Sequence, residues 1–226
     1  MKNIPIILIN RDRLSCTEKL VDQLLLLGYT NLYILDMDSS YPALLSWYKD
    51  NKNFTLIQSE NTGHKTLWEK NLLRNLFSEH EWVAVTDSDI SLSPDTPKGF
   101  IEQMITVAKD FRTDKVGLAI KYKDITNPHL FKIIEPIESN YWRKERTLAH
   151  PCYKCFDAPV DTTFCVVRPN KPFQYQAVRL ADWSIQHLDW YMDFEKLTEE
   201  QTYYFEHADP KVSTTKQHYL KWKNKD

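Results

Sequence analysis

The chain has 226 residues, 42% of them hydrophobic and 27% charged, and its formal net charge is −2. These values are typical of a globular chain with a sizeable core, and they exclude a disordered one. Because nucleic-acid binding usually needs a basic face, we expect no nucleic-acid partner. No apolar run approaches the roughly 20 residues of a membrane span, and the start of the chain lacks the features of a signal peptide. Four cysteines without an export signal then predict reduced thiols and a cytoplasmic protein.

The first half of the chain alternates strand and helix signals. Apolar and β-branched runs predict strands at residues 4–9, 32–35, 54–57, 82–86 and 116–120. Apolar spacing and end signals predict helices from a capping box at Ser15 and Glu18 to Gly28, from Ser39 or Ser40 through Pro42 to about Tyr48, from Thr66 to Phe77, and from Asp95 or Thr96 to about Lys109. This alternation predicts an α/β fold with a mainly parallel central sheet flanked by helices.

The second half breaks the alternation. Residues 121–159 mix prolines, charges and aromatics without a period, so we expect a loop-rich region over an active site. Residues 162–167 and 175–180 predict further strands, as a small antiparallel C-terminal addition, and residues 198–207 predict a helix. We expect a loose tail after Val212. Without a repeat or an interdomain linker, residues 1–226 are expected to form a single domain.

The most informative motif is Asp87-Ser88-Asp89, which directly follows the predicted strand at 82–86. Open α/β sheets bind ligands beyond the carboxyl ends of their strands. Two carboxylates there suit Mn²⁺ or Mg²⁺, which can hold a diphosphate. The chain has only four glycines and no glycine-rich phosphate loop, so a metal would have to neutralise the phosphates of a bound nucleotide.

Four polar loops follow strands of the first half, and the predicted topology gathers them at one edge of the sheet. They are residues 10–13, 36–38, 60–65 and 87–89. Each alone is equally well explained as a solvated loop. Four in series indicate a binding cleft with charges of both signs.

In the order of residues 4–13, Asp36 or Asp38, and Asp87-Ser88-Asp89, the chain resembles glycosyltransferases of the GT-A type, in particular the family-2-like group. Loops 10–13 and 60–65 are also similar to those of a glycosyltransferase domain with which large algal viruses decorate their capsid protein. The resemblance implies a nucleotide-sugar-binding half at 1–120 and an acceptor-side half at 121–226. It also implies a UDP-sugar donor, Mn²⁺ or Mg²⁺, a glycan or glycoprotein acceptor, and the host cytoplasm if the protein is viral.

The resemblance assigns roles to individual residues. Asp89 would be a direct metal ligand, Asp87 a ligand or ribose contact, and His187 a third ligand, with a satisfied core histidine as the alternative. Asp161 would be the base that takes the acceptor proton, unless it only orders the turn after Pro159. The nucleotide-sugar contacts would be Asn10, Arg11, Arg13, Asp36, Asp38, Asn61, His64, Lys65 and Ser88, with helix capping as the alternative for Asp38 and a surface role for the basic residues. Trp190 and Tyr191 would stack on a sugar or pack in the core.

Two other classes of function compete with this one. A sugar nucleotidyltransferase also binds a metal on an α/β sheet, but it usually has a glycine-rich loop after the first strand. A non-catalytic nucleotide- or glycan-binding module would share the cleft. The pair Cys152 and Cys155 near His150 lacks the four ligands of a structural zinc site, and Cys16 and Cys165 are isolated, so we interpret all four cysteines as ordinary thiols.

Overall fold

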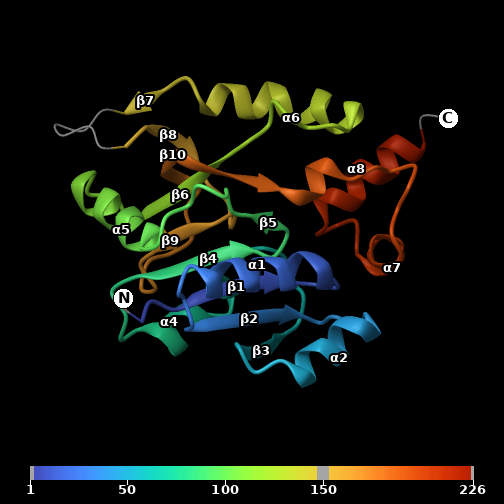
Figure 1. The fold of residues 1–226 in the computed structure, drawn as a ribbon, viewed down its shortest axis with the longest axis horizontal. Coiled ribbons are helices and arrows are strands. Elements are labelled where there is room, and N and C mark those ends of the chain that lie inside the picture. Colours follow the sequence, from blue (N-terminus) through green and yellow to red (C-terminus); the bar gives the residue numbers. More distant parts are fainter. Residues whose placement is uncertain (1–2, 147–152, 225–226) are drawn as a thin grey trace.

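A computed structural model describes residues 3–146 and 153–224. Their strands form one mixed sheet with the order β3-β2-β1-β4-β9-β6-β10-β8-β7, and β5 pairs with β10 outside this path (Figure 1). The strands are β1 (Ile6–Asn10), β2 (Leu32–Met37), β3 (Thr55–Ser59), β4 (Val83–Asp87), β5 (Ile90–Ser91), β6 (Lys115–Ile120), β7 (Glu145–Arg146), β8 (Cys155–Pro159), β9 (Cys165–Val167) and β10 (Gln176–His187).

The sheet is parallel in its first half and mixed in its second. β1 pairs in parallel with β2 and β4, and β2 with β3, whereas β9 lies antiparallel between β4 and β6. β10 is parallel to β6 and antiparallel to β8. The predicted strand at 162–167 is thus a short central strand. The one at 175–180 extends to His187 and is antiparallel to β8 and β5 but parallel to β6.

Helices cover both faces of the sheet and one of its ends. They are α1 (Leu14–Leu26), α2 (Pro42–Asp50), α3 (Thr66–Glu69), α4 (Leu72–Phe77), α5 (Phe100–Asp110), α6 (Pro128–Tyr141), the 3-10 helix η1 (Leu188–Tyr191), α7 (Glu199–His207) and α8 (Thr214–Lys223). Alternate residues of β1 point to opposite faces: Ile6 and Leu8 pack with α1 and α5, and Ile7 packs with α3 and α4. None of the described helices has both the length and the apolar character that a membrane crossing requires.

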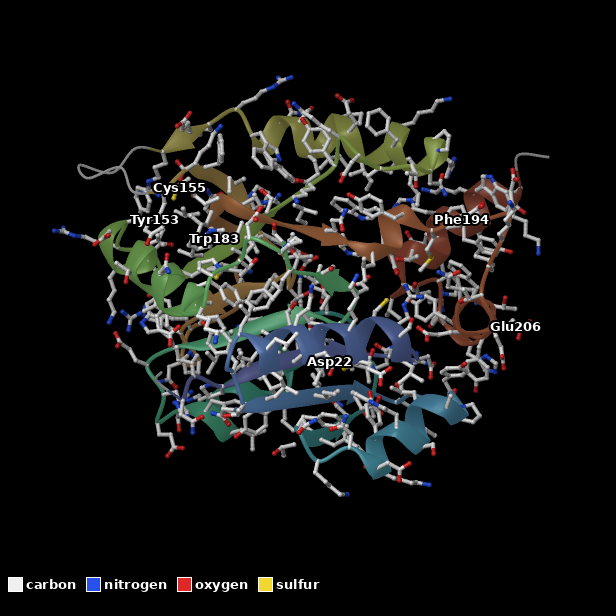
Figure 2. The ribbon with its side chains drawn as sticks, in the orientation of Figure 1. Asp22, Tyr153, Cys155, Trp183, Phe194 and Glu206 are labelled. Atoms are coloured by element: carbon white, nitrogen blue, oxygen red, sulfur yellow. The ribbon has the colours of Figure 1, made fainter. Side chains whose placement is uncertain are left out.

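A third apolar cluster joins α6, α7 and α8. Phe194, labelled in Figure 2, contacts the rings of Phe205, Tyr219 and Trp222. These aromatic contacts hold the last helix against the fold. The loose tail that we expected after Val212 is therefore wrong, because α8 starts one residue after Ser213, whose side chain accepts a hydrogen bond from the Lys216 amide.

Local end signals were right in some places and wrong in others. Gly28, at φ 91°, closes α1: its N–H bonds Leu25 O and the next amide bonds Leu24 O, which is a Schellman motif. The capping box at Ser15 is wrong, because α1 already starts at Leu14 and the Ser15 hydroxyl donates to Glu200 of α7.

Three further boundaries differ from prediction. The predicted helix at 66–77 is split at Asn71, whose φ is 53°, and the helix expected from Asp95 or Thr96 starts only at Phe100. The expected loop region at 121–159 contains α6, whose start is capped by the Asn127 side chain. Pro136 lies inside α6, where it removes one backbone donor but does not end the helix.

Candidate active site

The carboxyl ends of β1, β2 and β4 bring polar side chains to one edge of the sheet. Register alone places them there: Asn10 lies opposite Asp36, and Ile9 opposite Asp87. In Figure 1 the arrowheads of β2, β4 and β10 point to the side where α7 and α8 lie. This edge is where an open α/β sheet binds its ligand.

Asp87, Asp89 and His187 converge at this edge. Asp87 ends β4, and β5 then pairs antiparallel with β10, so that His187 lies opposite Ile90. The Leu188 amide also donates to Asp89 O at 2.7 Å. As a result one ligand atom from each of the three side chains lies within 4.8 Å of the others, and His187 Nδ1 is 3.4 Å from Asp89 Oδ2.

The chemistry of this group fits a divalent cation. Burial and the neighbouring Asp89 carboxylate raise the pKa of Asp87 well above its usual range, although a hydrogen bond from Thr162 opposes this shift. His187 Nδ1 is buried without a hydrogen-bond partner. Two carboxylates and an imidazole are a donor set that accepts Mn²⁺, and a cation would satisfy the orphaned nitrogen and offset the repulsion between the carboxylates.

Two cavities meet at this group. The first, of about 200 Å³, lies between the first-half loops and the segment around α7 and α8. The second, of about 440 Å³, lies between β10 and α6. Four residues line both cavities, namely Asp87, His187, Asp189 and Thr215. A ligand in one cavity would therefore contact a ligand in the other beside the Asp-Asp-His group.

Most of the predicted nucleotide contacts lie around the first cavity. Six of the nine line it, namely Asn10, Arg11, Arg13, Asn61, His64 and Ser88. Asp36, Asp38 and Lys65 do not. Asp38 is exposed with a φ of 60°, and Lys65 faces the rings of Phe173 and Tyr175.

Asp36 acts on the cavity through a buried chain of hydrogen bonds. Ser88 Oγ donates to Asn10 Oδ1 at 2.8 Å, and Asn10 Nδ2 donates to the Tyr48 hydroxyl at 2.7 Å. The Tyr48 hydroxyl donates in turn to Asp36 Oδ1 at 3.2 Å. Asp36, at 3% exposure, therefore orients Asn10 and Ser88 from beneath the cavity wall.

The two arginines are already engaged by protein groups. Arg11 Nη1 donates to Met37 O at 3.0 Å. Arg13 is 4% exposed, forms an ion pair with Asp189 and lies over the Tyr204 ring. Arg13 thus joins the first loop to the C-terminal segment. The predictions did not include Asp189 or Tyr204, and only their long-range contacts mark them.

Asp161 lies at the second cavity, on a tightly held loop. Its side chain is 45% exposed, and Oδ1 is 3.4 Å from His64 Nε2. The buried Lys115 ammonium donates to the carbonyls of Val160, Asp161 and Gln174 at 2.7 to 2.9 Å. Sequence reasoning missed Lys115, because a lysine just before the strand predicted at 116–120 carries no signal of burial.

Trp190 and Tyr191 are separated by their packing. Trp190 lines the second cavity and stacks on His187 with ring centroids 4.9 Å apart and an interplanar angle of 2°. Tyr191 lines neither cavity and donates a 2.6 Å hydrogen bond to Asp124.

The described cysteines, Cys16, Cys155 and Cys165, line neither cavity. Burial raises the pKa of Cys155 to about 12 and that of Cys165 to about 11, as expected of buried thiols. Cys152 and His150 lie outside the described residues. Within the described chain, the Asp-Asp-His group is the one cluster with the composition and spacing of a metal site.

Comparison with solved structures identifies the fold. The mannosyltransferase PcManGT from Pyrobaculum calidifontis, in complex with GDP-Man and Mn²⁺, matches 96% of this chain and 74% of its own, with 14% identity and a TM-score of 0.52. The chain has a GT-A fold. UDP-glucose pyrophosphorylase (11% identity, 90% of this chain and 98% of its own, TM-score 0.42) and Staphylococcus aureus TarS 1–349 in complex with UDP (14%, 74% and 47%, 0.41) are more distant. No family model and no curated protein matches the sequence.

Proposed function

We propose that this protein is a metal-dependent glycosyltransferase that moves a sugar from a nucleoside diphosphate donor to a hydroxyl group. The observation that carries the proposal is the Asp87–Asp89–His187 group, which lies between two cavities at the carboxyl edge of a GT-A sheet. One cavity would receive the nucleotide and the other the acceptor. The transferred sugar would cross between them beside the metal.

Asp87, Asp89 and His187 would hold Mn²⁺ or Mg²⁺. The cation would neutralise the charge that develops on the departing diphosphate. This assignment agrees with the lack of a glycine-rich phosphate loop after β1. PcManGT was solved with Mn²⁺, which supports the same choice of metal.

The first cavity would bind the nucleotide part of the donor. Asn10 and Ser88 are held in place by the buried chain that ends at Asp36 and present amide and hydroxyl groups. Arg11 and His64 add basic groups at the rim of the cavity. We take UDP as the nucleotide to test first, with GDP as the comparison, since PcManGT was solved with GDP-Man.

Asp161 would serve as the base on the acceptor side. In an inverting reaction its carboxylate takes the proton of the acceptor hydroxyl while that oxygen bonds to the anomeric carbon and the sugar–diphosphate bond breaks. Lys115 holds the backbone of Asp161, and His64 lies beside its side chain. We propose a glycan or glycoprotein as the acceptor and the cytoplasm as the location of the protein.

Replacing Asp89 tests the proposal. Asp89→Asn should lower Mn²⁺-dependent turnover of UDP-sugar by at least about 100-fold, because it removes one charged metal ligand. The fold should stay intact. Asp22→Asn is the matched control, since Asp22, labelled in Figure 2, is exposed on α1 and lines neither cavity. Turnover measured as UDP release checks the change, and equal rates in the two variants would refute the metal assignment.

The same samples separate the competing functions. Calorimetry with UDP and Mn²⁺ reports binding, and a donor-hydrolysis assay reports chemistry. Binding without hydrolysis or transfer would indicate a binding module. Formation of UDP-sugar from UTP and a sugar 1-phosphate would indicate a nucleotidyltransferase.

A further inference from the structure

The second cavity has an aliphatic wall along one face of α6. Its aliphatic members recur at three- and four-residue spacing and are Leu130, Ile133, Ile134 and Ile137, with the aromatic Tyr141 one turn further on. Ile137 is 48% exposed, and Tyr175 across the cavity is 45% exposed. Of the five large hydrophobic side chains exposed in the described residues, two therefore line this one cavity. Exposed apolar side chains that gather in one place mark a binding site, and a ligand in the cavity would cover both of these.

The cationic groups of the second cavity are already neutralised. Arg179 donates to Glu138 at 2.7 Å and to Pro159 O at 2.8 Å, and both charged side chains are only 6% exposed. Burial lowers the pKa of His218, which keeps this imidazole neutral near pH 7. Asp87, Asp161 and Asp189 line the side next to the metal group. Apart from His187 of the Asp-Asp-His group, the described residues that line the cavity therefore offer an anionic ligand no unpaired positive charge.

The aromatic rings at the cavity already contact other side chains. His187 stacks on Trp190, and the Arg179 guanidinium lies 4.6 Å from the Tyr141 ring centroid. Phe173 meets Tyr175 edge to face at 4.8 Å. The aliphatic side of α6 adds the half-buried Ile133 and the exposed Ile137.

We propose that the second cavity binds a neutral acceptor that carries an aliphatic group next to its reacting hydroxyl. The aliphatic group would lie on the α6 wall around Ile133 and Ile137, and the hydroxyl would face Asp161 and the metal group, with which the cavity is continuous. This inference rests on the proposed function, because only a transferase has an acceptor. The apolar binding itself can be measured without turnover.

Binding of two simple glycosides tests the proposal. Calorimetry on the full chain would compare hexyl β-D-glucoside with methyl β-D-glucoside, which share a head group and differ by a chain of methylenes. We expect hexyl glucoside to bind at least about tenfold more tightly, since burial of methylenes is favourable. Ile137→Asn should weaken hexyl glucoside about fivefold or more and leave methyl glucoside unchanged.

Leu76→Asn is the matched control, because Leu76 is also 48% exposed but lies on α4 outside the cavity. Ile137→Thr, which keeps a β-branched side chain, serves as a second variant if Ile137→Asn unfolds. Equal affinity for the two glucosides, or equal effects of the variants at 137 and 76, would overturn the proposal. Tighter binding of hexyl phosphate than of hexyl glucoside would also overturn it, because the acceptor would then be anionic.

Binding of UDP with Mn²⁺, measured on the same samples, distinguishes this failure from failure of the proposed function. If UDP binds and the donor is hydrolysed but the protein binds hexyl and methyl glucoside equally well, the proposed acceptor class is wrong and the proposed transferase activity stands. If hexyl glucoside is preferred but neither UDP binding nor hydrolysis occurs, the apolar site stands and the transferase is wrong.

Discussion

Single buried groups set the position of the loop that carries Asp161. The Lys115 ammonium has three donors, and three backbone carbonyls accept from them. This arrangement offsets the cost of burying a charge. The same loop includes Thr162, whose hydroxyl donates to Asp87 at 2.7 Å. Lys115 thus holds in place a loop that carries the proposed base, Asp161, and that also contacts a proposed metal ligand, Asp87.

A glycine on β6 leaves room for this loop. A Cβ built on Gly117 would lie 2.6 Å from Val160 Cγ1, next to Asp161. Gly117→Ala should therefore destabilise the protein by about 1 to 3 kcal/mol through overpacking. The same substitution should also lower kcat for transfer, because the loop that it displaces carries Asp161. Urea unfolding and steady-state kinetics would measure the two effects.

The double variant Gly117→Ala, Val160→Ala separates crowding from other causes. If the clash explains the loss, removing the Val160 methyl groups recovers part of it, and the two substitutions are not additive. Full additivity of the free energies of unfolding would show that Gly117 is needed for a different reason.

At the scale of elements, polar contacts join the C-terminal segment around η1 and α7 to the first half of the chain. Arg13 pairs with Asp189 in the interior, and Ser15 donates to Glu200 at the surface. The Tyr203 hydroxyl donates to Ser40 O at 3.0 Å. Arg13 and Asp189 both line the first cavity, so these contacts hold the C-terminal segment beside it.

The buried contact should matter far more than the surface one. Asp189→Ala leaves the Arg13 guanidinium buried without its counter-charge and should cost about 3 kcal/mol or more. Glu200→Ala removes an exposed partner and should cost about 1 kcal/mol or less. Chemical denaturation of the two variants checks this order. Equal losses would show that Arg13 reaches solvent when Asp189 is absent.

Elements were predictable where local signals agree with packing. The parallel strands were found because each is a short apolar run, and Gly28 marks the end of α1. α6 was missed because prolines, charges and aromatics mix without a clear period over residues 121–159, although Asn127 and Pro128 are an ordinary helix start. α8 has no fully buried residue, so its sequence shows little of the apolar stripe that reveals most helices.

The part of the site that could be predicted from the sequence is the part that follows from the order of the strands. Asp87 and Asp89 could be placed at the sheet edge from the sequence alone, because β4 ends there. His187 reaches them through the β5–β10 pairing, a contact nearly a hundred residues apart along the chain that no local pattern encodes. Its role was inferred from resemblance alone and remains a prediction.

At the scale of the whole molecule, the mixed sheet builds a site that is unfavourable without a bound cation. The parallel half contributes Asp87 and Asp89, and the long strand β10 contributes His187. Burial beside Asp89 raises the pKa of Asp87, so the ionised pair costs stability. A cation that binds only the folded chain would recover this cost.

Thermal unfolding with and without Mn²⁺ tests this linkage. At a Mn²⁺ concentration 100 times the dissociation constant, the gain is about 2.7 kcal/mol, which raises the unfolding midpoint of a chain of this size by roughly 5 to 10 °C. EDTA should reverse the shift. Asp89→Asn should lose the shift, yet without metal its midpoint should not fall below that of the unmodified chain, because the substitution removes repulsion from Asp87. An equal Mn²⁺ shift in both proteins would place the cation elsewhere.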